Sequence, residues 1–137
     1  MTVDPSTLTS GADQAYFAGL MKGEVRLQYC EGCGTHHWPA VFRCPDCGSW
    51  DHVWRAVQPR GTIYSWTRTW HSFGGLDAFE TPFVSVVVSL QDVPSVRLLG
   101  VLQGKEDGLA IGAQVTGRTH SIEFLGRPVP ALSWSLA

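Results

Sequence analysis

Two Cys-x-x-Cys pairs, at residues 30–33 and 44–47, stand ten residues apart and use all four cysteines of the chain. Within each pair a tight turn lets both thiols bind one metal ion, and Gly34 and Gly48 directly follow the pairs and supply the permissive backbone of such a turn. The ten intervening residues suffice for two short strands that bring the turns around one tetrahedral four-sulfur site. The pattern predicts a zinc ribbon. Its expected ligands are Cys30, Cys33, Cys44 and Cys47.

A closed shell of four sulfurs leaves no position for water or substrate, so the zinc ion is expected to be structural. The ribbon segment 27–54 is shorter than the ~40 residues that usually fold without help, and bound zinc contributes on the order of 10 kcal/mol. His36 and His37 lie between the pairs and are expected to be loop residues rather than ligands. Sulfur also binds iron, and residues 44–48 resemble half of a rubredoxin site, which keeps a small iron electron carrier as an alternative.

Charge and hydropathy limit the classes of partner. The net charge is −2 and the ten basic residues are scattered, so nucleic acid is a disfavoured partner. The opening residues 1–14 have no basic n-region, and no apolar run reaches the ~18 residues of a membrane span. We therefore expect a cytoplasmic protein without a membrane partner, in a compartment where thiols persist as metal ligands.

A short helix is expected before the ribbon, from Asp13 to Lys22. Ser10 or Asp13 can cap its start and Gly23 can end it. Apolar residues recur three and four positions apart, at Tyr16, Phe17 and Leu20 among others. A helix this short needs a buried apolar face, so it either covers its own domain or docks on another protein.

Residues 58–61 mark the expected domain boundary, and the sequence after them has the pattern of β-strands. We expect a mainly β chain: the short helix within residues 1–26, the zinc ribbon over 27–57, and an OB-fold domain over 58–137. The five expected strands of its barrel cover residues 61–73, 83–91, 96–104, 113–126 and 129–137. A β-sandwich is the alternative.

Side chains alternate along a strand, so the first barrel strand is expected to carry one face formed by Tyr64, Trp66, Arg68 and Trp70. Aromatic rings with an interleaved arginine can stack a nucleobase or the adenine of a nucleotide cofactor. The alternative is that the tryptophans are core or partner contacts.

Catalytic residues are hard to assign. All four cysteines belong to the predicted metal site, so none is left to act as a nucleophile. A serine nucleophile would need a general base, and no residue in the sequence is identified as one. His71, His120, Asp77 and Glu80 have no motif spacing. We expect no active site contained wholly in this chain.

Six segments carry a resemblance to a known family: AYFAGLMKGEVRLQYCEGCG, WPAVFRCPDCGSW, GTIYSWTRTW, TPFVSVVVSL, LLGVL and LAIGAQVTG. The chain resembles the small proteins that join an N-terminal helix and a rubredoxin-like zinc ribbon to a C-terminal OB fold. Trp38-Pro39-Ala40 stands where members of that family often have a Pro-Pro-Arg-like run.

The resemblance implies a non-catalytic companion of thiolase-like enzymes. Such companions pair with acetoacetyl-CoA thiolase and hydroxymethylglutaryl-CoA synthase, with thiolases that act as retro-aldolases on steroid side-chain CoA esters, or with hotdog-fold enoyl-CoA hydratases. By analogy, the chain is a zinc-dependent accessory subunit in a hetero-oligomer that helps hold an acyl-CoA or steroid-CoA thioester. The expected partner or CoA contacts are Tyr16, Phe17, Leu20, Tyr64, Trp66, Arg68 and Trp70. A module that binds single-stranded nucleic acid remains an alternative.

Overall fold

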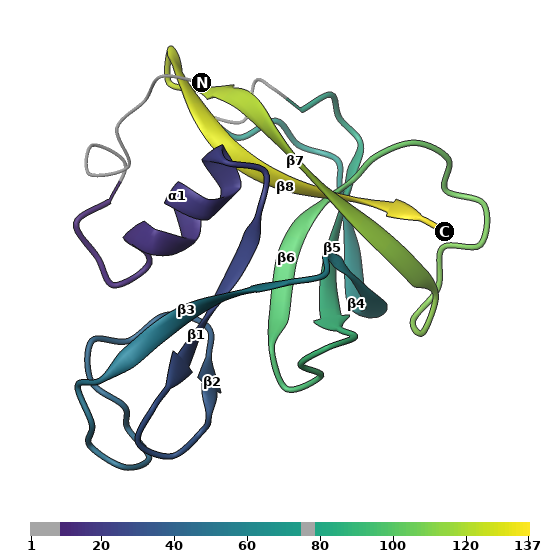
Figure 1. Ribbon diagram of the computed structural model, residues 1–137. Coiled ribbons are helices and arrows are strands. Elements are labelled where there is room, and N and C mark those ends of the chain that lie inside the picture. Colours follow the sequence, from purple (N-terminus) through teal and green to yellow (C-terminus); the bar gives the residue numbers. More distant parts are fainter. Residues whose placement is uncertain (1–8, 75–78) are drawn as a thin grey trace.

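One short helix, a small three-stranded sheet and a five-stranded barrel follow one another along the chain (Figure 1). The structure, a computed structural model, describes residues 9–74 and 79–137. In these ranges no helix has the length and apolar character needed to cross a membrane.

The helix α1 spans Gln14–Met21, within one residue of the expected ends. Asp13 occupies the N-cap position, where its backbone carbonyl accepts hydrogen bonds from the amides of Tyr16 and Phe17 at 3.0 and 3.3 Å. The Asp13 side chain makes no capping hydrogen bond to the helix. Its Oδ1 instead accepts a hydrogen bond from the Thr9 hydroxyl at 2.9 Å. Gly23 follows with φ +80°, a left-handed conformation that glycine adopts without strain, and ends the helix.

The ribbon sheet has the order β2-β1-β3, with β1 at Val25–Cys30, β2 at His36–His37 and β3 at His52–Val57. Only one short strand, β2, lies between the cysteine pairs, so the expectation of two strands there is wrong. In place of a second strand, the buried side chain of Gln28 forms hydrogen bonds with the backbone of this loop. Its Nε2 donates to the Val41 carbonyl at 2.6 Å, and the Val41 amide donates to Oε1 at 2.9 Å.

The barrel confirms the five-stranded OB architecture, closed in the order β4-β5-β6-β8-β7. Its strands are β4 (Arg60–Thr69), β5 (Phe83–Leu90), β6 (Arg97–Leu102), β7 (Gln114–Phe124) and β8 (Arg127–Leu136). The β6–β8 pair is parallel and the other pairs are antiparallel. Along β5, alternate residues from Val84 to Leu90 are buried, as expected for a strand with one face in a core.

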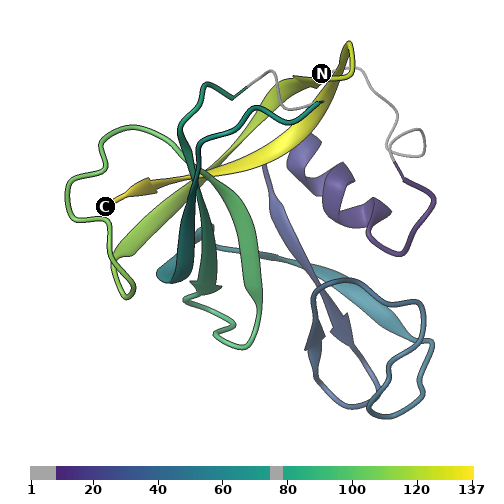
Figure 2. The ribbon, with the colours of Figure 1, turned by 180° about the vertical axis from the view of Figure 1, so that it is seen from behind.

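Helix α1 lies in the angle between the ribbon sheet and the barrel, against β1, β7 and β8 (Figures 1 and 2). Tyr16 and Leu20 are only 5% and 4% exposed and belong to the main hydrophobic core. The ring of Tyr16 also lies 4.2 Å from that of Trp38 in the ribbon loop. The helix therefore packs on its own chain.

Candidate functional site

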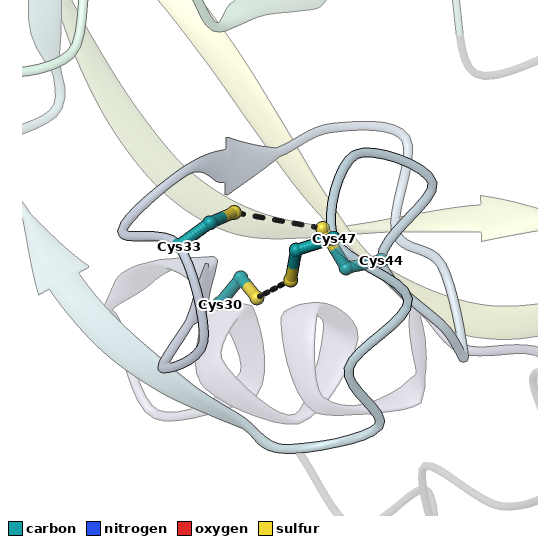
Figure 3. Close-up of side chains that lie close together, drawn as sticks. All are labelled: Cys30, Cys33, Cys44 and Cys47. Atoms are coloured by element: carbon teal, nitrogen blue, oxygen red, sulfur yellow. Dashed lines mark hydrogen bonds between the residues drawn. The ribbon is translucent and has the colours of Figure 1, made fainter.

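The two cysteine turns, whose side chains face each other in Figure 3, have the same pattern of backbone hydrogen bonds. The amides of Gly34 and Gly48 donate to the carbonyls of Cys30 and Cys44, both at 2.8 Å. The amides of these two cysteines donate in turn to the carbonyls of the residues after the glycines, both at 2.9 Å. Gly34 and Gly48 have φ of +77° and +80°, so both expected turn glycines occupy the conformation that the turn requires.

The four sulfurs of the cluster all lie within 4.8 Å of one another. Cys30 Sγ is 3.6 Å from Cys47 Sγ, and Cys33 Sγ is 3.7 Å from Cys44 Sγ. A tetrahedral site with zinc–sulfur bonds of about 2.3 Å separates its sulfurs by about 3.8 Å. The observed separations fit this geometry and are far longer than the ~2.05 Å of a disulfide. This donor set can hold one zinc ion.

The cluster is closed on its inner side and open on its outer side. Cys30 and Cys44 are buried, whereas Cys33 and Cys47 are exposed. Hydrogen bonds with Thr35 lower the pKa of the Cys33 thiol to about 7. The bond with the Thr35 side chain has the largest effect, and the bond with its backbone follows. A Cβ atom at Gly32 would lie 3.0 Å from Cys47 Sγ, so the first turn contacts the second closely at this residue.

His37, which the sequence analysis expected to be a loop residue, contacts the sulfur cluster. It lies in β2, not in a loop, and its Nε2 is 3.2 Å from Cys44 Sγ. As the Nε2–H tautomer it donates a hydrogen bond to this sulfur, a contact of the kind that orients a metal ligand. His36 points elsewhere, with its ring 5.1 Å from that of Tyr29. The spacing of the cysteines contains no signal for this contact, because the β1–β2 pairing creates it.

The expected aromatic face on β4 is divided by a β-bulge. The register with β5 shifts between Ile63 and Ser65, and such a shift moves the following side chains to the other face. Trp66 and Arg68 consequently pair with Val86 and Val84 and share their face, and Trp66 is still 36% exposed.

Tyr64 lies instead against Arg97, whose guanidinium carbon is 3.8 Å from the ring centre. Arg97 precedes the buried Leu98 in β6 and is itself exposed. Trp70 follows the end of β4 and is 73% exposed. Tyr64 therefore does not share a face with Trp66 and Arg68, and the prediction of one face formed by all four residues is wrong.

The other candidate residues are dispersed. Arg68 forms an ion pair with Glu106 and lies 5.5 Å from the Trp66 ring. Burial, followed by the charge of Arg118, lowers the pKa of His120 in β7. His71 contacts the Phe73 ring, and within residues 9–74 and 79–137 no hydrogen bond or ion pair joins His71, His120 and Glu80. Asp77 lies outside the described residues.

An apolar pocket of about 560 Å³ lies where α1, the ribbon loop and the barrel meet. Three of the expected contact residues, Tyr16, Phe17 and Leu20, line it. Little of Tyr16 or Leu20 is left at the surface, whereas Phe17 is half-buried.

Comparison with known proteins gives two adjacent family matches. Residues 17–53 match the family described as the rubredoxin-like zinc ribbon domain of ChsH2, and residues 54–120 match the C-terminal OB-fold domain of ChsH2. A search of curated proteins found no match.

Two solved structures share the fold. The first, described as "Ltp2-ChsH2(DUF35) aldolase", has a chain with 25% sequence identity and a TM-score of 0.77, and the match covers 93% of this chain and 95% of that one. The second is a DUF35 protein of unknown function from Sulfolobus solfataricus, with 17% identity, a TM-score of 0.60 and coverage of 97% and 90%. A zinc ribbon and an OB-fold domain thus occur together in known relatives. The chain belongs to the ChsH2 family, whose members join a rubredoxin-like zinc ribbon to a C-terminal OB-fold domain.

Proposed function

We propose that this chain is a non-catalytic, zinc-binding subunit of a cytoplasmic thiolase-like retro-aldolase. In this role it stabilises the complex and helps position an acyl-CoA or steroid-CoA thioester. The observation that carries the proposal is the match, over 93% of the chain, to a chain of the Ltp2–ChsH2 aldolase. The family resemblance read from the sequence points to the same kind of partner.

The metal cluster supports a structural role. Cys30, Cys33, Cys44 and Cys47 would hold zinc, and four sulfurs complete a tetrahedral shell. Substrate therefore has no coordination position to occupy, and the chemistry is assigned to the partner subunit.

An exposed aromatic side chain on the barrel supports a contact surface. Trp70, which follows the end of β4 and does not line the pocket, is 73% exposed. Aromatic residues are enriched in the centres of protein interfaces. We assign the barrel surface around Trp70 to the partner subunit.

Co-purification with a separate partner tests the subunit assignment. The tagged chain is expressed with a thiolase-like protein of the same genome, and the eluate is examined by size-exclusion chromatography, light scattering and metal analysis. We expect a stable hetero-oligomer with about one zinc ion per copy of this chain. A chain that stays monomeric and leaves aldolase turnover unchanged contradicts the proposal.

Two exposed tryptophans provide a matched pair of variants for the contact surface. Trp70→Ala should weaken the complex, because this side chain lies on the proposed surface. Trp50→Ala removes a side chain of similar exposure, 66%, from the ribbon and should leave the complex intact. If the two changes have equal effects on the complex, the assignment of the barrel surface to the interface is wrong. The aldolase KM for the CoA thioester, with and without this chain, tests the positioning of substrate separately.

A further inference from the structure

The pocket between α1, the ribbon loop and the barrel has the properties of a small-molecule site. Its volume of about 560 Å³ falls within the ~300–1,000 Å³ typical of ligand pockets. Tyr16, Phe17 and Trp38 form one side, and Phe73 and Phe83 contribute from the barrel side. Every described lining residue is uncharged at neutral pH, so a charged group inside the pocket would find no partner.

Three hydroxyl-bearing residues, Tyr16, Thr69 and Ser85, interrupt the apolar lining, and Tyr16 is the one contributed by α1. Tyr16 is 5% exposed, yet in the described part of the chain its Oη has no hydrogen-bond partner. A tyrosine hydroxyl is protonated at neutral pH and can donate, and burial raises the pKa of Tyr16 further. A buried tyrosine hydroxyl usually finds a partner.

A second unpartnered donor lies behind the pocket lining and is not part of it. Trp134 is completely buried, and its Nε1 has no hydrogen-bond partner among the residues that the structure describes. A Cβ atom at Gly100, which lines the pocket, would lie 2.9 Å from this nitrogen. The missing side chain at Gly100 thus leaves the indole directly behind the lining.

We propose that this pocket binds an uncharged, mainly apolar small molecule whose single carbonyl-type oxygen accepts a hydrogen bond from Tyr16. The aromatic walls bind its apolar body, and the uncharged lining selects against carboxylates and phosphates. This site is contained in the chain itself, so it goes beyond the proposed role as a subunit.

Fluorescence titration of the zinc-loaded full chain tests the proposal. The probe is the neutral naphthyl ketone prodan, whose emission reports both polarity and hydrogen bonding. We expect saturable binding with blue-shifted emission, and displacement by 2-undecanone but not by undecanoate. Displacement by the two competitors at equal concentrations would overturn the proposal.

Two pairs of variants localise the probe. Ala131→Phe fills the pocket and should weaken prodan binding by about tenfold or more, whereas the same change at the exposed Ala56 of β3 should not. Tyr16→Phe keeps the ring and removes only the donor, with an expected loss of about 2- to 12-fold, and Tyr29→Phe is its control. Unchanged affinity in Ala131→Phe or in Tyr16→Phe would overturn the proposal.

Addition of the partner subunit distinguishes a small-molecule pocket from a protein interface. If an added aldolase subunit displaces prodan from the pocket, the pocket belongs to the protein interface and the small-molecule proposal is wrong. Because the titration uses this chain alone, its failure leaves the subunit proposal standing. A failed co-purification, conversely, leaves the titration result unaffected.

Discussion

The ribbon and the barrel are stabilised in different ways. The barrel buries a continuous apolar core: Ile63, Val84, Val86, Val88, Leu90, Leu98, Leu102, Val115, Leu132 and Trp134. In the ribbon, over residues 25–57, the buried apolar side chains are Val25, Leu27, Cys30 and Cys44, and the last two belong to the sulfur cluster. A segment this small cannot bury enough apolar surface to fold alone. Val25 and Leu27 belong to the same core cluster as the barrel residues, so we expect bound zinc to add to this packing in the ribbon and to be dispensable in the barrel.

Cys44→Ser should have the largest effect of the variants considered. We expect it to unfold the ribbon while the barrel stays folded. Cys44 is buried and lies 3.7 Å from Cys33 Sγ, and structural zinc contributes on the order of 10 kcal/mol. Hydrogen exchange should show loss of protection in β1 and β3 and retained protection in β5 and β6. Removal of zinc by a chelator from the unaltered chain should give the same pattern.

Asp46→Asn is the matched control in the same turn. Asp46 lies near His37 and Cys44 and could bind a metal with them, but it is not part of the four-sulfur cluster. We expect this variant to keep both its zinc and its ribbon protection. If Asp46→Asn loses metal as Cys44→Ser does, the site is built from His37, Cys44 and Asp46, and the four-sulfur assignment fails.

The features predictable from the sequence are the local ones. Thiols three residues apart with a glycine after them define the cysteine turns wherever the turns lie in the fold, because the chemistry and the backbone conformation are set within five residues. Alternation along β5 likewise predicts a strand with one buried face.

Features that depend on strand pairing could not be predicted. The bulge near Tyr64 changes which residues share a face, and it exists only in the register of β4 with β5. The hydrogen bonds between Gln28 and Val41 join residues 13 positions apart, and they stand where a second strand was expected from the length of the loop. The contact of His37 with Cys44 follows from the pairing of β2 with β1. Each of these requires knowledge of a neighbour that is distant in sequence.

Gly61→Ala should give the converse effect, a weakened barrel beside an intact ribbon. Gly61 is buried in β4 between β5 and β7, and an added Cβ would lie 2.0 Å from the Ser89 carbonyl oxygen. The obstacle is backbone, so a strand must move, and we expect a loss of about 3 kcal/mol in the free energy of unfolding. Urea unfolding measures the loss, and metal analysis should show that zinc is retained.

Gly74→Ala is the control for this change, because a Cβ there meets nothing within 4 Å. Its stability should match that of the unaltered chain. If Gly61→Ala also releases zinc, the two regions unfold as one unit, and the comparison between them no longer holds.

His37→Ala should have the smallest of the three effects and tests how the ribbon holds its metal. His37 Nε2 lies 3.2 Å from Cys44 Sγ, and removal of such an outer hydrogen-bond partner typically costs about 10- to 100-fold in metal affinity. Competition with a chromophoric chelator measures the affinity, and His36→Ala is the matched control, since the structure places His36 against Tyr29. A loss as large as that of Cys44→Ser would make His37 a ligand in place of a thiol. An affinity equal to that of His36→Ala would mean that the four sulfurs hold the metal without help from β2, so that the ribbon depends on its cysteine turns alone.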